Sequence, residues 1–398
     1  MLVGGFIFTA LLLFYVGYLV RCAWHWGRLR ANASADEPLP RVSVIIPARN
    51  EAANIEACLN AVFAQDYPAD ALEVIVVNDH SEDATAGIAV AVARNHLGAD
   101  AVSFAHPIGE NVSGGGSSSV GGRFRLLNLD AQTGPAYKKA AVAFGIRQSR
   151  GEIIVTTDAD CTMGPGWLRA MVGGFSEETG LVSGPVELAS WDGFTQMQAL
   201  EFMGLIAVGA ASIAAGSPTM CNGANLAYRR RAYDEVGGFS GIDHIASGDD
   251  ELLMHKIAAQ GHWKVAFMKR KVAIVRTPAQ GTWAEFKAQR IRWVSKSGQY
   301  KRRGITAILV LSYLAVLGFP VLAVAGIWEH RLWWLMLGHL ALKIVAEAAV
   351  LVPAARFFDK LRLLPWLPVE QVAHIAYVLW VGIAGQRKSY QWKGRTVK

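Results

Sequence analysis

Cysteine is scarce in this chain, which contains only four among its 398 residues: Cys22, Cys58, Cys161 and Cys221. They lie far apart, and none has the close spacing that pairs of zinc-binding cysteines show. A small, disulfide-stabilised extracellular fold is equally excluded, because such folds need many cysteines in a short chain. The scarcity is typical of a reduced domain that faces the cytosol.

Features that mark nucleic-acid and ATP sites are also missing. The net charge is +7 and the isoelectric point about 9.2, yet no stripe of Arg, Lys and aromatic residues and no zinc-finger spacing accompany it, so we expect no nucleic-acid partner. The Gly/Ser-rich stretch Gly109–Gly122 lacks the Lys-Ser/Thr ending of a phosphate-binding P-loop and is typical of a surface loop. The positive charge therefore suits an anionic substrate or an anionic membrane face.

Charged residues are few as well, at 18%, whereas 52% of residues are hydrophobic and the mean hydropathy is positive. Three apolar stretches, Leu2–Val20, Ile305–Ile327 and Leu332–Val352, are long enough to span a bilayer. Basic residues follow the first and the third, so the positive-inside rule places those ends in the cytoplasm. These features predict a multi-pass membrane protein of the bacterial inner membrane.

A last apolar stretch, Leu364–Gly385, carries Glu370, Gln371 and His374 and precedes a basic tail at 387–398. A full span there would put the tail outside, against the charge rule. We therefore expect this stretch to lie in the interface or to re-enter the membrane.

Between the apolar ends the pattern alternates strands and helices. Val42–Ile46, Leu72–Val77 and Phe124–Leu127 are predicted strands, and the alternation predicts an α/β fold with a doubly wound, parallel sheet. The resulting division is an anchor over 1–30, a polar linker over 31–40, a catalytic domain over 41–300, and membrane or interfacial helices with the tail over 301–398.

Two aspartates follow the buried strand that begins at Ile153. In extended backbone Asp158 and Asp160 project the same way and can share one divalent cation, for which carboxylates suit Mg2+ or Mn2+. Ligand sites in parallel sheets form beyond these strand ends. Such a pair is also common in turns and helix caps, so it acquires weight only together with other residues.

Further polar groups follow the earlier strand ends. The turn Pro47-Ala48-Arg49-Asn50-Glu51 can present N–H groups and Arg49 to a nucleotide, and Asp79 can bind a base or ribose. A cap at Asn50 and an Asx turn from Asp79 to Ser81 are the structural alternatives. Lys138 and Lys139 open a helix, where positive charge opposes the helix dipole, so an anionic ligand explains them better than a solvated face.

Two acidic residues, Asp249 and Asp250, precede the amphipathic helix 252–259. A helix N-terminus keeps Asp250 ionised, and the carboxylate can then take the proton of an attacking hydroxyl. Asp249 would orient the acceptor. A simple helix cap is the alternative.

The basic helix 282–300 contains Gln289, Arg292 and Trp293 on one face. Arg292 can neutralise a departing diphosphate, and Trp293 offers a flat ring to an acceptor. The other basic residues of this helix can contact anionic lipid: Lys287, Arg290 and Lys296.

Taken in order, these motifs resemble the family-2 inverting glycosyltransferases, in particular the membrane-bound members related to cellulose and hyaluronan synthases and to ceramide glucosyltransferases. The likeness covers about residues 41–300 and rests on seven motifs: VSVIIPARNE, VVNDHSEDAT, YKKAA, TTDAD, CNGANLAYRR, SGDDELL and QRIRW.

The resemblance implies a Rossmann-like domain of the GT-A type, a nucleotide-diphospho-sugar donor such as a UDP-sugar, and a divalent metal. It assigns Asp160 as main metal ligand with Asp158 beside it on the donor, Asp79 and Lys138 to the nucleotide, and Asp250 as base. It gives the diphosphate and acceptor to Gln289, Arg292 and Trp293. Asp249 stands where the family has Glu, which places acceptor positioning in doubt.

The apolar stretch Thr195–Ala215 is expected either to pack at the membrane surface beside the acceptor or to form a buried core helix, and Asn222 after it to line the acceptor side by analogy with the family.

The favoured function is inverting sugar transfer to a lipid-linked or membrane-proximal hydroxyl. A processive polysaccharide synthase, a metal-dependent nucleotidyl- or phosphotransferase and a silent membrane scaffold are the alternatives.

Overall fold

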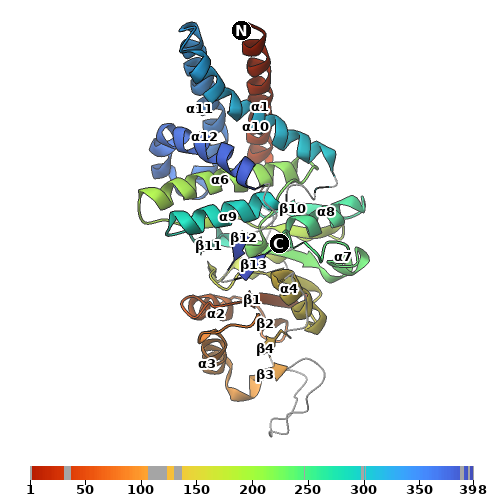
Figure 1. Cartoon of the computed structure of the whole chain (residues 1–398). Coiled ribbons are helices and arrows are strands. Elements are labelled where there is room, and N and C mark those ends of the chain that lie inside the picture. Colours follow the sequence, from red (N-terminus) through yellow and green to blue (C-terminus); the bar gives the residue numbers. More distant parts are fainter. Residues whose placement is uncertain are drawn as a thin grey trace.

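The computed structural model describes residues 2–30, 37–105, 123–129, 137–245, 247–296, 300, 302–385, 390–392 and 395–397. The predicted loop Gly109–Gly122 and most of the linker lie outside these residues. Figure 1 shows an α/β domain from which long helices project at one end, with the N-terminus at their far tip.

An eight-stranded sheet forms the centre of the α/β domain, in the order β10-β7-β9-β5-β1-β2-β4-β3. Its strands are β1 (Val42–Ala48), β2 (Leu72–Asn78), β3 (Val102–Ala105), β4 (Phe124–Asn128), β5 (Ile153–Thr156), β7 (Thr179–Ser183), β9 (Leu226–Arg229) and β10 (Lys264–Phe267). β1 pairs in parallel with β2 and β5, and nearly all its residues are buried. The three strands predicted from the sequence are therefore confirmed, although β1 continues through Pro47 to Ala48 rather than ending before it.

The sheet is mixed rather than parallel throughout. β9 runs antiparallel to both β5 and β7, and a second sheet joins β6 (Thr162–Met163), β11 (Val275–Pro278) and β8 (Val186–Ala189). These strands have two to four residues each, too few for a periodic pattern in the sequence. The α/β class is confirmed, and the mixed half of the sheet is what the sequence pattern did not predict.

Helices cover the parallel part of the sheet on both sides. Figure 1 shows α2 (Ile55–Phe63) and α3 (Thr85–Leu97) on one side of β1, β2 and β4, and α4 (Tyr137–Gln148) on the other. The remaining helices of the domain are α5 (Trp167–Val172), α7 (Arg230–Glu235), α8 (Glu251–Ala259) and α9 (Trp283–Ser295). α4 and α8 both begin at the edge of the sheet where β5 ends, which positions the cleft described below.

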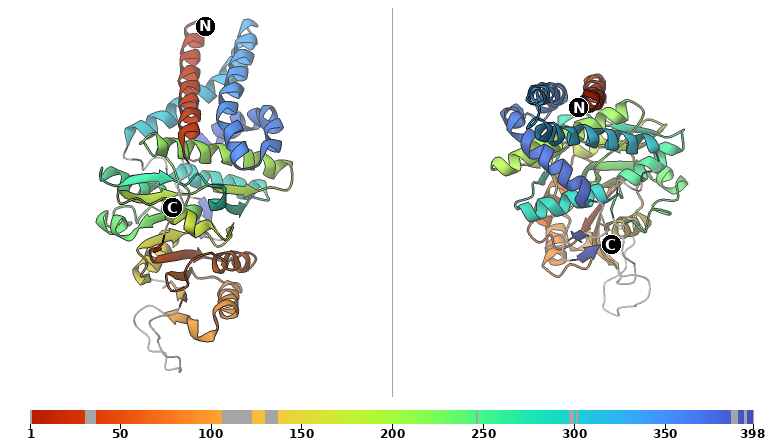
Figure 2. Two further views of the ribbon diagram at one scale, coloured as in Figure 1. Left: turned by 180° about the vertical axis from the view of Figure 1, so that it is seen from behind. Right: turned by 45° about the horizontal axis from the view of Figure 1, so that its top comes forward.

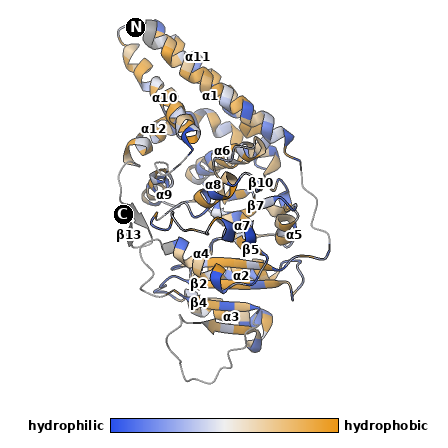
Figure 3. Cartoon of the chain, turned by 90° about the vertical axis from the view of Figure 1, so that its right-hand side faces the viewer, coloured by the Kyte–Doolittle hydropathy of each residue, from blue (hydrophilic) through white to orange (hydrophobic). Residues whose placement is uncertain are grey.

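Five helices in the described part of the chain are long and apolar enough to cross a membrane. They are α1 (Leu2–Arg28), α6 (Gly193–Ala214), α10 (Arg303–Ala325), α11 (Arg331–Phe357) and the segment Leu361–Ala384, which ends in α12 (Leu367–Ala384). Figure 2 shows α1 and α11 side by side, projecting from the domain, and Figure 3 shows that these helices are mostly hydrophobic. The predicted apolar spans are thus helical.

α1 extends beyond its predicted end at Val20. Trp26, at its carboxyl end, is 1% exposed and contacts the rings of Phe267 and Phe357, while Lys269 lies over its indole at 4.5 Å. The last turns of α1 are therefore anchored in the domain rather than in a membrane.

α6 lies across the base of the projecting helices (Figure 1). Its apolar window is 61% buried, compared with 22–28% for the other four, because it contacts α1, α11 and β8. Of the two expectations for this stretch, the buried helix fits better, although its position at the base also keeps it next to the membrane helices.

After α12 the chain returns to the α/β domain. The hairpin of β12 (Tyr390–Trp392) and β13 (Arg395–Val397) pairs in antiparallel fashion, and β12 contacts α9. The hairpin therefore lies beside the catalytic domain, and the interfacial or re-entrant position of Leu364–Gly385 stays a prediction, since this segment is also long and apolar enough to span a membrane.

Candidate active site

One lysine joins the aspartates of two distant segments. Lys138, in the first turn of α4, places its Nζ 2.5 Å from Oδ1 of Asp158 and 3.8 Å from Oδ2 of Asp249. Asp158 follows β5, whereas Asp249 precedes α8. Burial disfavours the charge of Lys138, but Asp158, Asp249 and Asp250 outweigh it and raise the lysine pKa. The two acidic motifs, some ninety residues apart in sequence, therefore share one cleft.

Asp250 is the N-cap of α8, as the helix-cap interpretation requires. Its Oδ1 accepts a hydrogen bond from the N–H of Glu251 (2.7 Å), and its Oδ2 accepts one from the N–H of Gly223 (3.0 Å). Burial by itself raises the pKa of Asp250, but Lys296, these two N–H groups and Lys138 together lower it. The carboxylate is thus ionised at neutral pH, so capping the helix and accepting a proton are compatible.

The positive charge that stabilises the ionised Asp250 comes from Lys296, which sequence analysis expected to contact anionic lipid. Lys296, just after α9, is buried, and its Nζ lies 3.7 Å from Oδ1 of Asp250 and 3.2 Å from Oε1 of Glu251. Tyr300 donates to the other carboxylate oxygen of Glu251 (2.6 Å). The prediction of a lipid-facing Lys296 is therefore wrong, because a buried carboxylate pair outcompetes solvent for its ammonium group.

Arg290 was also expected on a lipid-facing surface, and that expectation is wrong too. It is 1% exposed, pairs with Glu201 of α6 at 2.5 Å, and lies over the ring of Trp293 at 4.2 Å. Lys287 alone of the three basic residues is exposed.

The proposed acceptor face of α9 packs in part against α6. Trp293 packs on Phe202 of α6, with ring centroids 5.8 Å apart, and Gln289 accepts a hydrogen bond from Arg290 (3.1 Å). Arg292 is half-buried, and its contact with the diphosphate stays a prediction. Trp293 joins α9 to α6, and Gln289 accepts from Arg290, which itself pairs with Glu201 of α6.

The aspartate pair after β5 does not have the extended backbone assumed from its spacing. The strand ends at Thr156, and Asp158 accepts a backbone hydrogen bond from Cys161, which closes a turn around Asp160. Both carboxylates are half-buried at the cleft. Among the described residues, no three His, Cys, Asp or Glu side chains could hold a metal ion between them.

The loops after β1 and β2 are tied to each other. Arg49 is buried and donates to the carbonyl oxygens of Asp79 (2.9 Å) and His80 (2.8 Å). The carboxylate of Asp79 is 2% exposed and contacts Nδ1 of His80 at 2.9 Å. Asn78, rather than Asp79, makes the Asx-type bond to the N–H of Ser81 (3.1 Å).

The turn at the end of β1 also lacks the predicted cap. Asn54 is the N-cap residue of α2, while Asn50 has a positive φ of 50° and accepts from the N–H of Glu82. Glu51 is buried and accepts from the side chain of Asn54 (2.9 Å), and Pro47 pairs with Val77 within the sheet. These contacts hold the loop after β1 in place at the strand ends.

Lys139 and Asn222 hold the loops that border the cleft. Lys139 is 1% exposed and donates to the carbonyls of Ile242 (2.6 Å) and Ile245 (2.7 Å), so the expected anionic contact at Lys139 is wrong. Asn222 accepts from the N–H of Ala224 (2.9 Å) and thereby starts the turn that carries Gly223 to Asp250.

Sequence analysis missed Lys296, Glu251 and Tyr300 as members of the cleft. Glu251 did stand beside the recognised aspartates, but Lys296 and Tyr300 lie after α9 without a motif of their own. Only the fold, which returns the end of α9 to the start of α8, brings them together.

The fold and this acidic cleft define a glycosyltransferase of the GT-A type. Residues 121–398 match the model of glycosyl transferase family 21, and residues 43–106 match that of glycosyl transferase family 2. Because the first match covers well over half of the chain, the protein belongs to glycosyl transferase family 21. The resemblance to family-2 glycosyltransferases is likewise confirmed.

Two curated relatives are also glycosyltransferases. The glycosyltransferase AglE of Haloferax volcanii is 33% identical over 53% of this chain and 59% of its own length, and the probable glycosyltransferase YdaM of Bacillus subtilis is 26% identical over 70% of this chain and 58% of its own. The chain therefore spans about three fifths of the length of these relatives.

Among solved structures, the mannosyltransferase PcManGT of Pyrobaculum calidifontis, determined with GDP-Man and Mn2+, shares the fold. It aligns over 96% of this chain and 98% of its own with a TM-score of 0.59 and 21% identity.

Proposed function

We propose that the protein transfers a sugar from a nucleotide-diphospho-sugar to a hydroxyl of a membrane-proximal acceptor, with inversion at the anomeric carbon. The observation that carries this proposal is that Asp158, Asp249 and Asp250 converge around Lys138, where β5 ends and α8 begins. A helix cap alone explains Asp250, but it does not explain why Asp158, from a segment some ninety residues away, meets Asp249 at the same lysine.

The donor occupies the strand-end side of the cleft. The loop from Pro47 to Glu51, held by Arg49, and the buried Asp79 would surround the nucleoside. Lys138 would exchange its contact with Asp158 for the diphosphate. A UDP-sugar is the donor we expect, and the related mannosyltransferase, solved with GDP-Man, makes a guanosine donor the first alternative.

A divalent cation, Mg2+ or Mn2+, fits this half of the cleft. Asp158 and Asp160 provide two carboxylates on one turn, and the remaining ligand positions would be left for phosphate oxygens and water, which is how Mg2+ is usually held. The cation, when bound, supplies positive charge to the departing diphosphate.

Asp250 performs the proton transfer. The acceptor oxygen forms a bond to the anomeric carbon as its proton passes to the Asp250 carboxylate, and the bond from that carbon to the diphosphate breaks on the opposite face. The nucleoside diphosphate leaves with the electron pair, and an α-linked donor gives a β-linked product. Arg292, a half-buried arginine of α9, would add positive charge for the leaving group.

The acceptor enters from the side of the membrane helices. Asn222 and Asp249 border that side of Asp250. Trp293 packs against α6, and Gln289 supports Arg290, which pairs with Glu201 of the same helix; α6 lies at the base of α1 and α11. With the basic ends of the apolar segments in the cytoplasm, the cleft also faces the cytoplasm, and a lipid-borne acceptor can reach it without leaving the bilayer.

Nucleotide release from a panel of UDP- and GDP-sugars, measured with Mn2+ and membrane lipid extract, tests the proposal. Asp250→Asn should lower kcat about 10²–10⁴-fold, because a general base is lost while the shape of the side chain is kept. The matched control is Asp243→Asn, an exposed acid on the preceding loop, which should retain full activity.

Three results would contradict parts of this proposal. Undiminished turnover by Asp250→Asn removes this residue as base, and a nucleoside monophosphate product indicates a nucleotidyl- or phosphotransferase. An α-linked product in the NMR spectrum excludes inversion. Product length separates a single addition from the processive alternative, which would yield a ladder of chain lengths.

A further inference from the structure

A cavity of about 420 Å³ lies between the carboxyl end of α1, the carboxyl end of α6 and the start of α10. Its lining includes three arginines, two serines and a threonine, and no acidic residue: Arg21, Arg302, Arg303, Ser212, Ser217 and Thr219. None of these arginines has a carboxylate partner among the described residues. Such a lining is suited to an anion.

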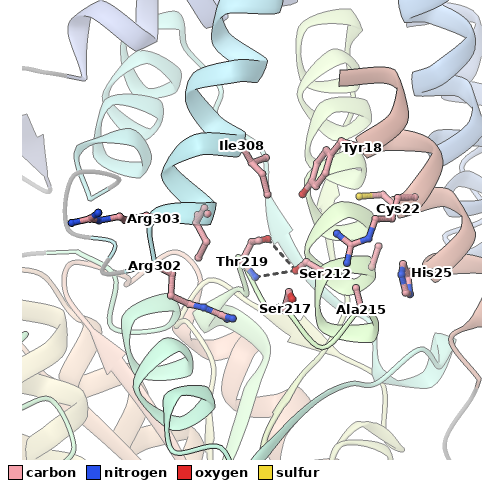
Figure 4. A pocket seen from close by; sticks show the side chains of 14 residues that line it. Tyr18, Cys22, His25, Ser212, Ala215, Ser217, Thr219, Arg302, Arg303 and Ile308 are labelled. Carbon is pink, nitrogen blue, oxygen red and sulfur yellow. Dashed lines mark hydrogen bonds between the residues drawn. The ribbon is translucent and has the colours of Figure 1, made fainter. Parts of the chain in front are cut away.

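Polar and apolar groups are separated within this cavity. Figure 4 shows Arg302 reaching toward Ser217 on one side, while Tyr18 and Ile308 stand at the opposite side, on the helices that project from the domain. The side chain of Arg303 points away from the other labelled residues, so Arg21 and Arg302 carry the argument. Beyond Tyr18 and Ile308, α1 and α10 present exposed apolar residues such as Phe14 and Leu309.

Helix ends reinforce the preference for negative charge. α10 begins here without a side-chain cap, so its first N–H groups, including that of Gly304, have no side-chain acceptor. The carbonyl groups at the carboxyl end of α6 would repel an anion, but two of them accept backbone hydrogen bonds from the residues that follow the helix. Gly216 (φ 69°) and Ser217 donate to the carbonyls of Ile213 (2.9 Å) and Ser212 (3.0 Å), as in a Schellman motif.

The cavity wall continues directly into the active site. Thr219 lines the cavity, and Gly223, four residues later, donates to Asp250. Four residues span at most about 14 Å. The carbonyl of Thr219 also contacts Nε2 of His255 (3.0 Å) on α8, the helix that Asp250 caps. The cavity wall at Thr219 therefore lies within about 14 Å of Gly223, the residue that contacts the proposed base.

We propose that this cavity binds the phosphate or diphosphate headgroup of the acceptor lipid, with the lipid chain along the apolar sides of α1 and α10 and the accepting hydroxyl directed to Asp250. This inference rests on the proposed function and narrows its acceptor to an anionic, phosphate-bearing lipid. A neutral headgroup would leave Arg21 and Arg302 without a counter-charge.

Binding of short-chain lipids to the full-length protein in phosphatidylcholine nanodiscs tests this without requiring turnover. Farnesyl diphosphate should bind at least about ten-fold more tightly than farnesol, because charge-assisted hydrogen bonds form only with the phosphate. Inorganic diphosphate should compete only weakly, since it lacks the apolar chain. Equal affinity for farnesol, or equal affinity for inorganic diphosphate, would overturn the proposal.

Arginine variants locate the site. Arg302→Gln and Arg21→Gln should each weaken farnesyl diphosphate about ten-fold. The control is Arg28→Gln, on the same helix as Arg21 but stacked on Trp24 outside the cavity, which should bind normally. Stabilisation of each variant by UDP or GDP with Mn2+ shows that its donor site is folded. Unaltered lipid affinity in both cavity variants would refute the assignment.

The same variants distinguish this inference from the proposed function. With a phosphate-linked lipid as acceptor, Arg302→Gln should raise its KM about ten-fold and leave donor hydrolysis by water unchanged. If wild-type protein binds the lipid but releases no nucleotide from any donor, the proposed transfer fails while the cavity assignment stands.

Discussion

Two clusters of charged side chains in the described part of the chain differ in how they meet solvent: the cleft between β5 and α8, and the contact between α1, α11 and α12. In the second region Lys343 is fully buried and pairs with Glu347 (2.5 Å) and with the amide oxygen of Gln371 (2.5 Å). Gln371 donates back to Glu347 (2.6 Å), which also accepts from Tyr15 (2.6 Å). Gln371 also donates to the buried Glu370 (3.3 Å). These side chains satisfy one another away from solvent, and we call them the closed group.

The cleft uses the same residue types differently. The side chain of Asp158 is 35% exposed and that of Lys138 21%, compared with 12% for Glu347 and 1% for Lys343. Three aspartates around Lys138 leave carboxylate oxygens without a fixed lysine contact. Solvent access and excess charge let ligands enter the cleft, whereas the closed group can only hold helices together.

Breaking the closed group should have the largest effect on stability. Lys343→Met leaves Glu347 buried without its cation, and losing one partner of a buried pair typically costs about 3–5 kcal/mol. Thermal unfolding of the detergent-solubilised protein measures this loss. Lys271→Met is the control, because its partner Asp359 is exposed and such surface pairs contribute at most about 1 kcal/mol.

The double variant Lys343→Met/Glu347→Leu should regain part of the stability lost, since no uncompensated charge is left. If Lys343→Met and Lys271→Met unfold alike, the closed group does not hold the helices together and the comparison fails.

Removing the charge of Lys138 from the cleft should instead lower activity. Lys138→Gln removes the charge that we assign to the donor diphosphate, and kcat/KM should fall about 10²-fold, as when one preorganised electrostatic contact is deleted. Its unfolding temperature should change little, because the neighbouring aspartates keep their access to water. A stability loss as large as that of Lys343→Met would show that the cleft, too, is structural.

A smaller effect is expected in the pH profile. The positive charge of Lys296 helps to lower the pKa of Asp250, so the proposed base is ionised above an unusually low pH. Lys296→Gln should raise that pKa and move the acidic limb of the kcat/KM profile to higher pH. Lys287→Gln, exposed on the same helix, should leave the limb in place. An unshifted limb in Lys296→Gln would mean that another group sets it.

The sequence predicted those parts of the fold that have long, regular patterns. The buried strands β1, β2 and β4 and the apolar helices are of this kind. β9 was not predicted, because four residues, Leu226–Arg229, have no distinctive period and their antiparallel placement depends on partners far along the chain.

For the cleft, motif chemistry predicted Asp250 and Lys138 in a common setting but misjudged Lys296 and Arg290. A basic residue on an amphipathic helix is usually solvated, and only tertiary contacts with Glu251 and Glu201 bury these two. The aspartates after β5 were recognised by spacing, yet their turn geometry depends on a backbone bond that spacing does not specify.

The adjacent lysines of α4 have opposite surroundings, one facing the cleft and the next fastened to the carbonyls of Ile242 and Ile245. Side chains at consecutive helix positions point about 100° apart. Because Lys139 is hydrogen-bonded to these two carbonyls, α4 cannot rotate about its axis without breaking those bonds, and the direction of Lys138 is fixed with it. The ammonium group of Lys138, which we propose contacts the donor diphosphate, is therefore oriented in advance by its neighbour. Little orientational freedom is left to be lost when the sugar nucleotide arrives.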